Sequence, residues 1–191
     1  MQAQRDDFSF FRPTRRSLVG SAALLSASAV ALLAGRDVLA QGKAGNPASD
    51  SDILNKALAS ELEAVAAYQV GAESGLLGAG AKTIALQFQG HHKAHADLLA
   101  GTIRKLGGKP VEARSRYSFP VEQLKAEVDV LRFAAGLEKG AVSANVGAVP
   151  LFGDRALAQA AATILADEAM HWAVFRQVLG ETPVVPAAFI G

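Results

Sequence analysis

The stretch "LQFQGHHKAHADLLAGTI", residues 86–103, holds three of the chain's four histidines within a largely apolar, helix-forming segment. Residues three or four apart lie on one face of a helix, so His92 and His95 share a face with Leu99. The fourth histidine, His171, lies in a second segment of the same kind, "ILADEAMHWAVF". Imidazoles on the buried face of a helix need a polar partner inside the core. The identity of that partner bears on both the fold and the function.

The composition excludes several classes of function. The chain has 191 residues, half of them apolar, and 19 basic residues against 18 acidic ones. A net charge of +1 gives no electrostatic case for binding nucleic acid or an anionic surface. Cysteine is absent, which excludes disulfides, thiolate metal sites and a lipidated cysteine anchor. Length alone allows one domain or at most two.

The first forty residues have the pattern of an export signal. A basic region precedes an apolar run, residues 18–34, and a short-residue cleavage site before Gln41. "TRRSLV", residues 14–19, resembles the twin-arginine motif, with Arg15 and Arg16 as the pair. We predict a cleaved signal over residues 1–40, the twin-arginine export machinery as a partner, and a periplasmic or otherwise exported location. The membrane would be contacted only through this signal. An ordinary export signal and an uncleaved anchor are the alternatives.

The remainder of the chain has helical periodicity and no segment with strand character. Residues 41–50, "QGKAGNPASD", are small and polar and predict a linker. Breaks rich in glycine and proline separate four helical segments. The predicted helices cover residues 51–73, 81–106, 120–149 and 155–179, and residues 181–191 form a C-terminal tail. Asp50 or Ser51 is the predicted N-cap of the first helix. We therefore predict an all-α fold with a single four-helix bundle over residues 51–180.

Each predicted helix carries a carboxylate or an imidazole in the middle of its apolar face. Burying an unpaired carboxylate costs several kcal/mol, so such groups need a compensating partner in the core. A metal cation is the simplest one. The predicted metal ligands are Glu61, His92, His95, Glu138, Glu168 and His171.

The heights of these residues along the helices agree with a shared site. Two residues face each other across a helical hairpin when the midpoint of their numbers falls in the turn. The midpoint of Glu61 and His92 lies in the glycine-rich turn "SGLLGAG", residues 74–80. The midpoint of Glu138 and Glu168 is residue 153, again in a predicted turn. Both hairpins thus bring their polar residues to one level.

Two neighbouring ionisable residues do not follow this pattern. Glu63 lies about 200° round the helix from Glu61 and should face solvent. His91 is one step off the stripe of His92 and is expected to be a partly exposed histidine that binds no metal, or else to flank the site.

The polar residues resemble the ferritin-like superfamily of carboxylate-bridged dimetal bundles. That pattern has one Glu on each of two helices and Glu-x-x-His on each of the other two. Glu61 and Glu138 resemble the single glutamates, "EAMH", residues 168–171, matches the motif in full, and Tyr68 lies where many members carry a tyrosine. The resemblance covers about residues 51–179 and is nearest to exported ferritin-like domain proteins with twin-arginine signals. It implies a ferritin-like four-helix bundle that binds metal.

The second helix departs from the family pattern. In place of Glu-x-x-His it has "HKAH", in which His92 replaces a carboxylate that would bridge two metals. Neutral imidazole binds terminally and lowers the negative charge of the site by one. A nitrogen-richer ligand set favours zinc or copper relative to the usual iron. Iron, manganese, zinc and copper are therefore all candidate cofactors, bound as one ion or more.

The connection between the second and third helices leaves two topologies open. Ferritin-like bundles cross along the whole bundle at this point. A loop over residues 107–119 reaches at most about 43 Å at ~3.3 Å per residue, against about 39 Å for a helix of about 26 residues. Up-down-up-down connectivity is the alternative.

Two functions are compatible with these features. The first is an exported ferritin-like metal-binding protein that handles metal or acts on dioxygen or peroxide as a metal-dependent oxidoreductase. The second is a metal-free four-helix scaffold with a stress or interaction role, its polar groups joined in a hydrogen-bonded network. The sequence has no glycine-rich phosphate loop and no Gly-x-Ser-x-Gly nucleophile turn. It assigns no catalytic residue, and the oligomeric state stays open.

Overall fold

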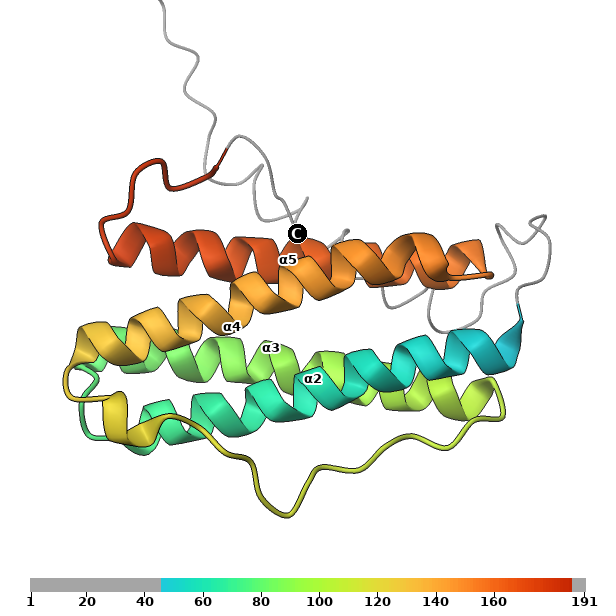
Figure 1. The fold of residues 1–191 in the computed structure, drawn as a ribbon, viewed down its shortest axis with the longest axis horizontal. Coiled ribbons are helices and arrows are strands. Elements are labelled where there is room, and N and C mark those ends of the chain that lie inside the picture. The colour runs from blue at the N-terminus through green and yellow to red at the C-terminus, as the bar shows by residue number, and fades with distance from the viewer. Residues whose placement is uncertain (1–45, 187–191) are drawn as a thin grey trace, which may run out of the picture. The chain divides into compact units, whose positions relative to one another are not determined.

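The computed structural model describes residues 46–186, and within them the chain forms a bundle of four long α-helices with no strand. The helices are α2 (Pro47–Glu73), α3 (Ala79–Lys105), α4 (Glu127–Ala148) and α5 (Arg155–Val178). Two short 3₁₀ turns, η1 (Val121–Gln123) and η2 (Val149–Leu151), precede and follow α4. The all-α four-helix prediction is confirmed (Figure 1). The predicted signal lies outside the described residues.

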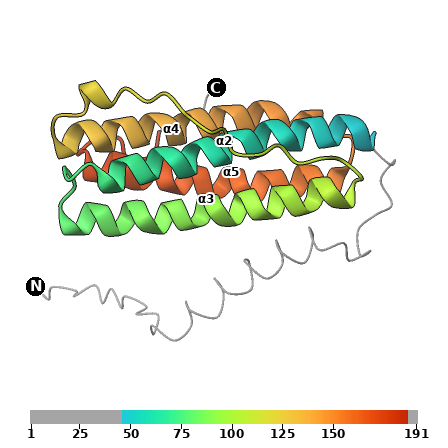
Figure 2. The ribbon, with the colours of Figure 1, turned by 90° about the horizontal axis from the view of Figure 1, so that it is seen from below.

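Two hairpins build the bundle, α2 with α3 and α4 with α5. The connection between them runs back along the length of the bundle, so α4 is parallel to α3 and antiparallel to α2 (Figures 1 and 2). This is the crossover topology, and up-down-up-down connectivity is excluded.

The third helix begins later than predicted, at Glu127 instead of near Pro120. Ala126 is its N-cap, and the carboxylate of Asp129 in the first turn accepts hydrogen bonds from the backbone N–H groups of Lys125 and Ala126 at 3.1 and 2.9 Å. The crossover therefore covers residues 106–126. At ~3.3 Å per residue these reach about 70 Å, well beyond the ~40 Å length of α3. The predicted loop over residues 107–119 would have to be almost fully extended to make this crossover, whereas the longer observed connection does not.

The first helix begins earlier than predicted, so residues 47–50 of the predicted linker are helical. Asn46 is the N-cap and accepts a hydrogen bond from the backbone N–H of Ala48, and Pro47 fits the first turn. Asp50, predicted to cap the helix, is instead buried. Its carboxylate accepts hydrogen bonds from the backbone N–H groups of Gly153 and Asp154 at 2.8 and 2.9 Å, which ties α2 to the turn before α5.

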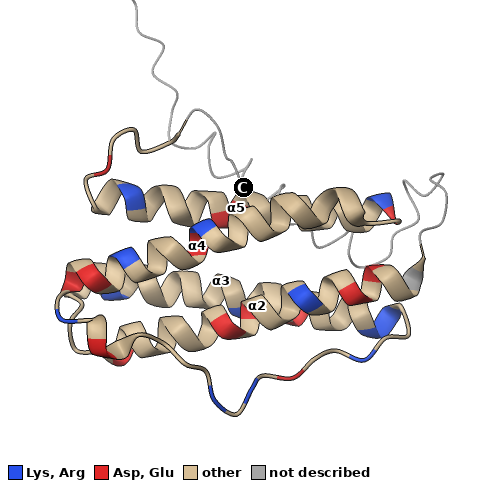
Figure 3. Ribbon diagram, viewed as in Figure 1, with Lys and Arg blue, Asp and Glu red and all other residues tan. Residues whose placement is uncertain are grey.

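The interior contains one aromatic end and one aliphatic end, with the polar residues between them. The aromatic end is centred on Tyr68, Phe88 and Phe175, and the aliphatic end includes Leu58, Ile103 and other residues buried at the far side of the polar layer. Acidic and basic residues are interspersed along the four helices (Figure 3). Among the described residues no helix combines the length and apolarity needed to span a membrane.

Candidate metal centre

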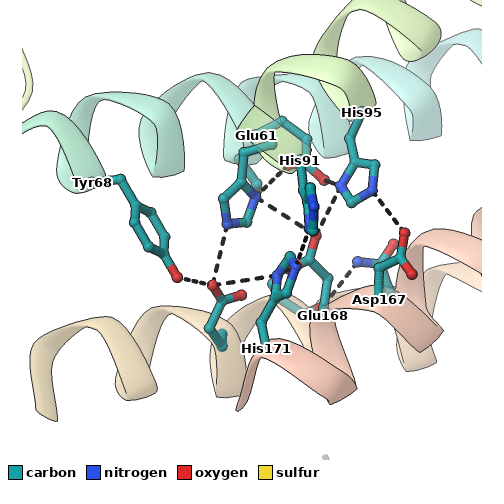
Figure 4. A network of polar contacts seen from close by, with 12 residues as sticks. Glu61, Tyr68, His91, His95, Asp167, Glu168 and His171 are labelled. Carbon is teal, nitrogen blue, oxygen red and sulfur yellow. Dashed lines mark hydrogen bonds and ion pairs between the residues drawn. The ribbon is translucent and has the colours of Figure 1, made fainter. Parts of the chain in front are cut away.

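All six predicted ligands meet in the middle of the bundle, one or two from each helix. Each of them is buried, and Glu138 and Glu168 are fully enclosed. The 3.6-residue period of the helices places these side chains on the inward stripe, and the hairpin turns bring them to one level. Figure 4 shows the side chains converging from opposite helices.

The six residues form two overlapping groups of four. In each group the ligand atoms lie within 4.8 Å of one another. The first group is Glu61, His92, His95 and Glu168, and the second is His92, Glu138, Glu168 and His171. Because His92 and Glu168 belong to both, the arrangement offers two adjacent positions that could each hold a cation, with Glu168 as a shared carboxylate.

His95 and His171, the last residues of the His-x-x-His and Glu-x-x-His motifs, both direct Nδ1 toward Glu168. His95 Nδ1 lies 3.1 Å from Glu168 Oε1, and His171 Nδ1 lies 3.2 Å from Glu168 Oε2. Their outer nitrogens contact different groups, Asp167 Oδ2 at 3.2 Å from His95 Nε2 and His91 Nδ1 at 2.8 Å from His171 Nε2 (Figure 4). Such outer partners fix the ring orientation and tautomer of a metal-ligating histidine.

His92 belongs to both groups of four and lies between Glu61 and Glu138. Its Nδ1 is 2.8 Å from Glu61 Oε2 and its Nε2 is 3.2 Å from Glu138 Oε1. Burial disfavours the charged imidazolium, but the bonds to Glu138 and Glu61 outweigh it and raise the pKa of His92 to about 10. Without metal, His92 therefore acts as a cation between two carboxylates.

In His95 and His171, as in His92, hydrogen bonds to carboxylates raise the pKa by more than burial lowers it. Burial opposes charge on His95, yet the bonds to Asp167, Glu168 and Glu61 raise its pKa to about 11. The pKa of His171 is also raised, because the bonds to Glu138 and Glu168 exceed the effect of burial. In contrast, burial and the neighbouring His171 lower the pKa of His91.

Glu138 is the predicted ligand whose hydrogen bonding is incomplete. Tyr68 donates a short hydrogen bond to its Oε1, while its buried Oε2 has no hydrogen-bond partner. Burial opposes charge on Glu138, but the bonds from His171 and His92 hold its pKa well below the usual range. Burial and the charge of Glu138 raise the pKa of Tyr68, so the phenol stays protonated. An ionised, buried oxygen without a partner fits a cation ligand.

A family model described as "Ferritin-like domain" matches residues 49–181, well over half of the chain. The chain belongs to the ferritin-like domain family. Among solved structures it is similar to a conserved hypothetical protein from Mycobacterium tuberculosis, with 22% identity and a TM-score of 0.63. That match covers 69% of this chain and 98% of the other, and it supports the fold alone. A search of curated proteins gave no significant match.

The ferritin-like pattern and the observed centre differ at His92. The residues still fit a metal, because carboxylate oxygens and imidazole nitrogens converge in a buried space and one carboxylate oxygen has no protein partner. Two divalent ions carry four positive charges, against three carboxylates in the set. The first group contains the carboxylates of Glu61 and Glu168, and the second contains those of Glu138 and Glu168.

Two neighbours of the predicted ligands stand differently against the sequence analysis. Asp167 was not singled out, whereas His91 is partly exposed, as expected, and also flanks the centre through its contact with His171, the alternative left open. Each precedes a predicted ligand directly in sequence. Their position next to predicted ligands in the sequence was the one available signal. It is not sufficient, because a side chain one residue away from the buried stripe reaches the site only when a neighbouring helix packs against that side of its own helix. Glu63, expected in solvent, is partly buried.

Proposed function

We propose that this ferritin-like protein is exported and binds one or two divalent metal ions in the buried centre, where it handles the metal or acts on dioxygen or peroxide. The single observation that supports this most is the pair of overlapping four-residue groups, with Glu168 common to both. Bound there, a redox-active ion would supply electron transfer to dioxygen or peroxide.

The chain's own residues would hold and orient the ions. Glu61 and His95 would complete the first position, and Glu138 and His171 the second, with Glu168 shared. Asp167 and His91 would keep the outer nitrogens of His95 and His171 in one tautomer. Tyr68, a protonated phenol beside Glu138, would hold that carboxylate in place.

His92 sets the preference for metal. An imidazole in place of a bridging carboxylate makes the donor set three nitrogens and three carboxylates, which by ligand softness favours zinc or copper over iron. Export by the twin-arginine route fits this proposal, because that route carries proteins that have folded and bound cofactors.

A metal-free scaffold is the second candidate, and one observation favours it. Among the described residues, Glu138 Oε2 is the sole buried side-chain oxygen or nitrogen without a hydrogen-bond partner. Charged histidines between carboxylates thus nearly complete a network without an ion.

Elemental analysis of the protein purified from its own compartment, with a competition titration against a chromophoric chelator, separates the two. We expect one to two equivalents of metal per chain and a loss of both in Glu168→Gln, which keeps the size of the side chain. A protein with no bound metal, and with the same melting temperature with and without added zinc, copper, iron or manganese, would support the scaffold instead.

Export is tested apart from metal. Arg15→Lys combined with Arg16→Lys should leave the protein in the cytoplasm, whereas unchanged export of the double variant would rule out the twin-arginine route.

A further inference from the structure

A groove separates the N-terminal half of α2 from the C-terminal half of α4. Its volume is about 530 Å³, within the range of roughly 300–1,000 Å³ found for small-molecule sites. The two helices are close at the other end, where a Cβ on Gly71 would lie 3.2 Å from Val130 Cγ1. Along the groove α4 presents small residues that leave the space between the helices unfilled: Gly136, Gly140, Ala141, Ala144 and Gly147.

The groove leads to the metal centre. Glu61, His92 and Glu138 form part of its lining, and the unpartnered Oε2 belongs to this Glu138. At the other end the groove reaches Ile53 and the exposed Leu151. A molecule in the groove would therefore extend from the surface to the ligands of the centre.

The size of the groove exceeds what a metal ion or dioxygen needs. A water molecule takes about 30 Å³, so the groove has room for an organic molecule. Its walls beyond the centre consist largely of aliphatic side chains, including Ala57, Leu137 and Ala144. An aliphatic chain is the chemistry that such walls would remove from water most favourably.

The charged residues along the groove favour one orientation of a bound molecule. Lys56 is the one lysine or arginine in its lining, and no ion pair is formed by its ammonium within residues 46–186, whereas His92, deeper in the groove, is paired with Glu61 and Glu138. The carboxylates Glu61, Glu63 and Glu138 lie further along the lining. Lys56 is five residues before Glu61, about 7.5 Å nearer the start of α2. In the metal-free protein an anionic group is thus favoured at Lys56 and disfavoured beside the three carboxylates.

We propose that the groove binds a free, elongated aliphatic carboxylate, with its carboxylate at Lys56 and its chain directed toward Glu138 and the metal centre. This extends the proposed function, since it places an organic molecule beside the metal ligands. Binding in the groove does not itself require metal, so the two proposals fail separately.

Decanoate is a suitable probe, and 1-decanol is its uncharged counterpart. Isothermal titration calorimetry on the full chain, with and without Zn²⁺, should show saturable binding of one decanoate per chain. Gly140→Leu should weaken it at least tenfold, because the added side chain fills the groove. Gly90→Leu on α3 is the matched control. Both glycines are helical with no atom within 4 Å of a built Cβ, so each variant gains helix propensity and should fold.

A second pair of variants tests whether the carboxylate of decanoate lies at Lys56. Lys56→Met keeps the apolar stem and removes the charge, so it should weaken decanoate about two- to fivefold, as expected for an exposed charge pair, and leave 1-decanol unchanged. Lys82→Met, at an exposed lysine on α3, should change neither. Ala144→Phe provides a second groove-filling variant and should reproduce the loss seen with Gly140→Leu.

The outcomes separate the alternatives. No saturable binding of decanoate by the wild-type chain, or equal binding by Gly140→Leu, Ala144→Phe and Gly90→Leu, would overturn the groove proposal whatever the metal content. Decanoate binding that is lost in both groove-filling variants, in a protein that takes up no metal, would support the groove and overturn the metal function instead.

Discussion

The two halves of the centre are built alike but differ in charge. The α2–α3 half supplies Glu61 and His92-x-x-His95, and the α4–α5 half supplies Glu138 and Glu168-x-x-His171. In the first half the outer nitrogen of the inward histidine meets a carboxylate, whereas in the second half it meets an imidazole. In the α2–α3 half, His92 in place of a carboxylate removes a negative charge, while Asp167 beside His95 adds one. In the α4–α5 half, Glu168 keeps the negative charge, and the partner of His171 is the imidazole of His91.

The outer partners have different consequences for the ligands. A carboxylate on the outer nitrogen raises the basicity of a ligating imidazole. His171 instead stacks on Phe88, at 4.0 Å between ring centroids, and on His91 at 5.1 Å. Because the pKa of His91 is lowered, it is neutral and accepts at Nδ1 only when its proton is on Nε2. We expect the position at Glu61, His95 and Glu168 to bind metal more tightly than the other.

Removing the shared carboxylate should have the largest effect, because it affects both halves. Glu168→Ala should abolish metal binding at both positions. In the metal-free protein it should cost about 3–5 kcal/mol, since three charged histidines lose a buried carboxylate partner. Chemical denaturation and a metal titration measure the two effects. Retention of one full equivalent of metal would show that the halves do not share Glu168.

The response to pH should be the next largest effect. The raised pKa values of His92 and His95 stabilise the metal-free fold fully below pH ~6.5, the value expected in the unfolded chain, and this contribution is lost as the pH rises through about 10 and 11. The lowered pKa of Glu138 contributes stability above its ordinary value near 4.5, which is lost at lower pH. Metal must displace the histidine protons, so its affinity should rise with pH.

Melting temperatures at pH 6 and pH 8.5, with and without zinc, check this. The metal-free protein should melt lower at pH 8.5, and the increase caused by zinc should be larger there. Glu168→Ala, as the control, should show no increase at either pH. A zinc effect that is the same at both pH values would contradict proton displacement from His92 and His95.

Replacing His92 by glutamate would make the two halves alike, and its effect on stability should differ in sign without and with metal. His92→Glu places a fourth carboxylate in the core, so the metal-free variant should be less stable than wild type by a few kcal/mol. With iron or manganese present, its melting temperature should rise by more than that of wild type, because four carboxylates compensate two divalent ions better. His92→Gln, which adds no charge, is the control. A His92→Glu variant that is less stable under every condition, beside a wild type with no metal effect, would exclude the site.

The smallest predicted changes are in metal affinity, after substitution of Asp167, the outer partner of His95, or His91, the outer partner of His171. Asp167→Asn should weaken metal binding at the His95 position by about tenfold, the low end for outer-partner variants, because Asp167 is partly exposed. His91→Gln should act on the other position. A two-step chelator competition reads the positions separately, with Asp97→Asn on the exposed face of α3 as the control. Equal shifts of both steps in Asp167→Asn would remove the proposed difference between the halves.

The helical period was enough to predict the fold and to identify residues that converge. His92 and His95 on one stripe, and hairpin midpoints that fall in turns, depend only on local geometry that the sequence specifies. The structure brings these residues together, while the binding of metal by them stays a prediction. The resemblance to ferritin-like proteins supplied the roles, and the family match agrees with it.

The features that escaped prediction depend on how helices meet. Asp50 looked like a cap but bonds to Gly153, about a hundred residues away, and no local pattern reports that. The start of α4 was misplaced because residues 120–126 lack a strong breaker after Pro120. The contact of Asp167 with His95 depends on the rotation of α5 against α3. The groove depends on the divergence of α2 from α4, which small residues such as Gly140 permit but do not specify.

Zinc binding at the two positions can be tested with a crystal structure of the full chain grown with zinc, with anomalous data collected at the zinc absorption edge. We predict an anomalous peak enclosed by Glu61, His92, His95 and Glu168, and a second, weaker peak enclosed by His92, Glu138, Glu168 and His171. In the same map His92 should lie further from Glu61 Oε2 than the 2.8 Å seen here, since an ion takes the place of that contact. A bundle with no anomalous peak at either position, and with the histidine–carboxylate contacts intact, would contradict the account.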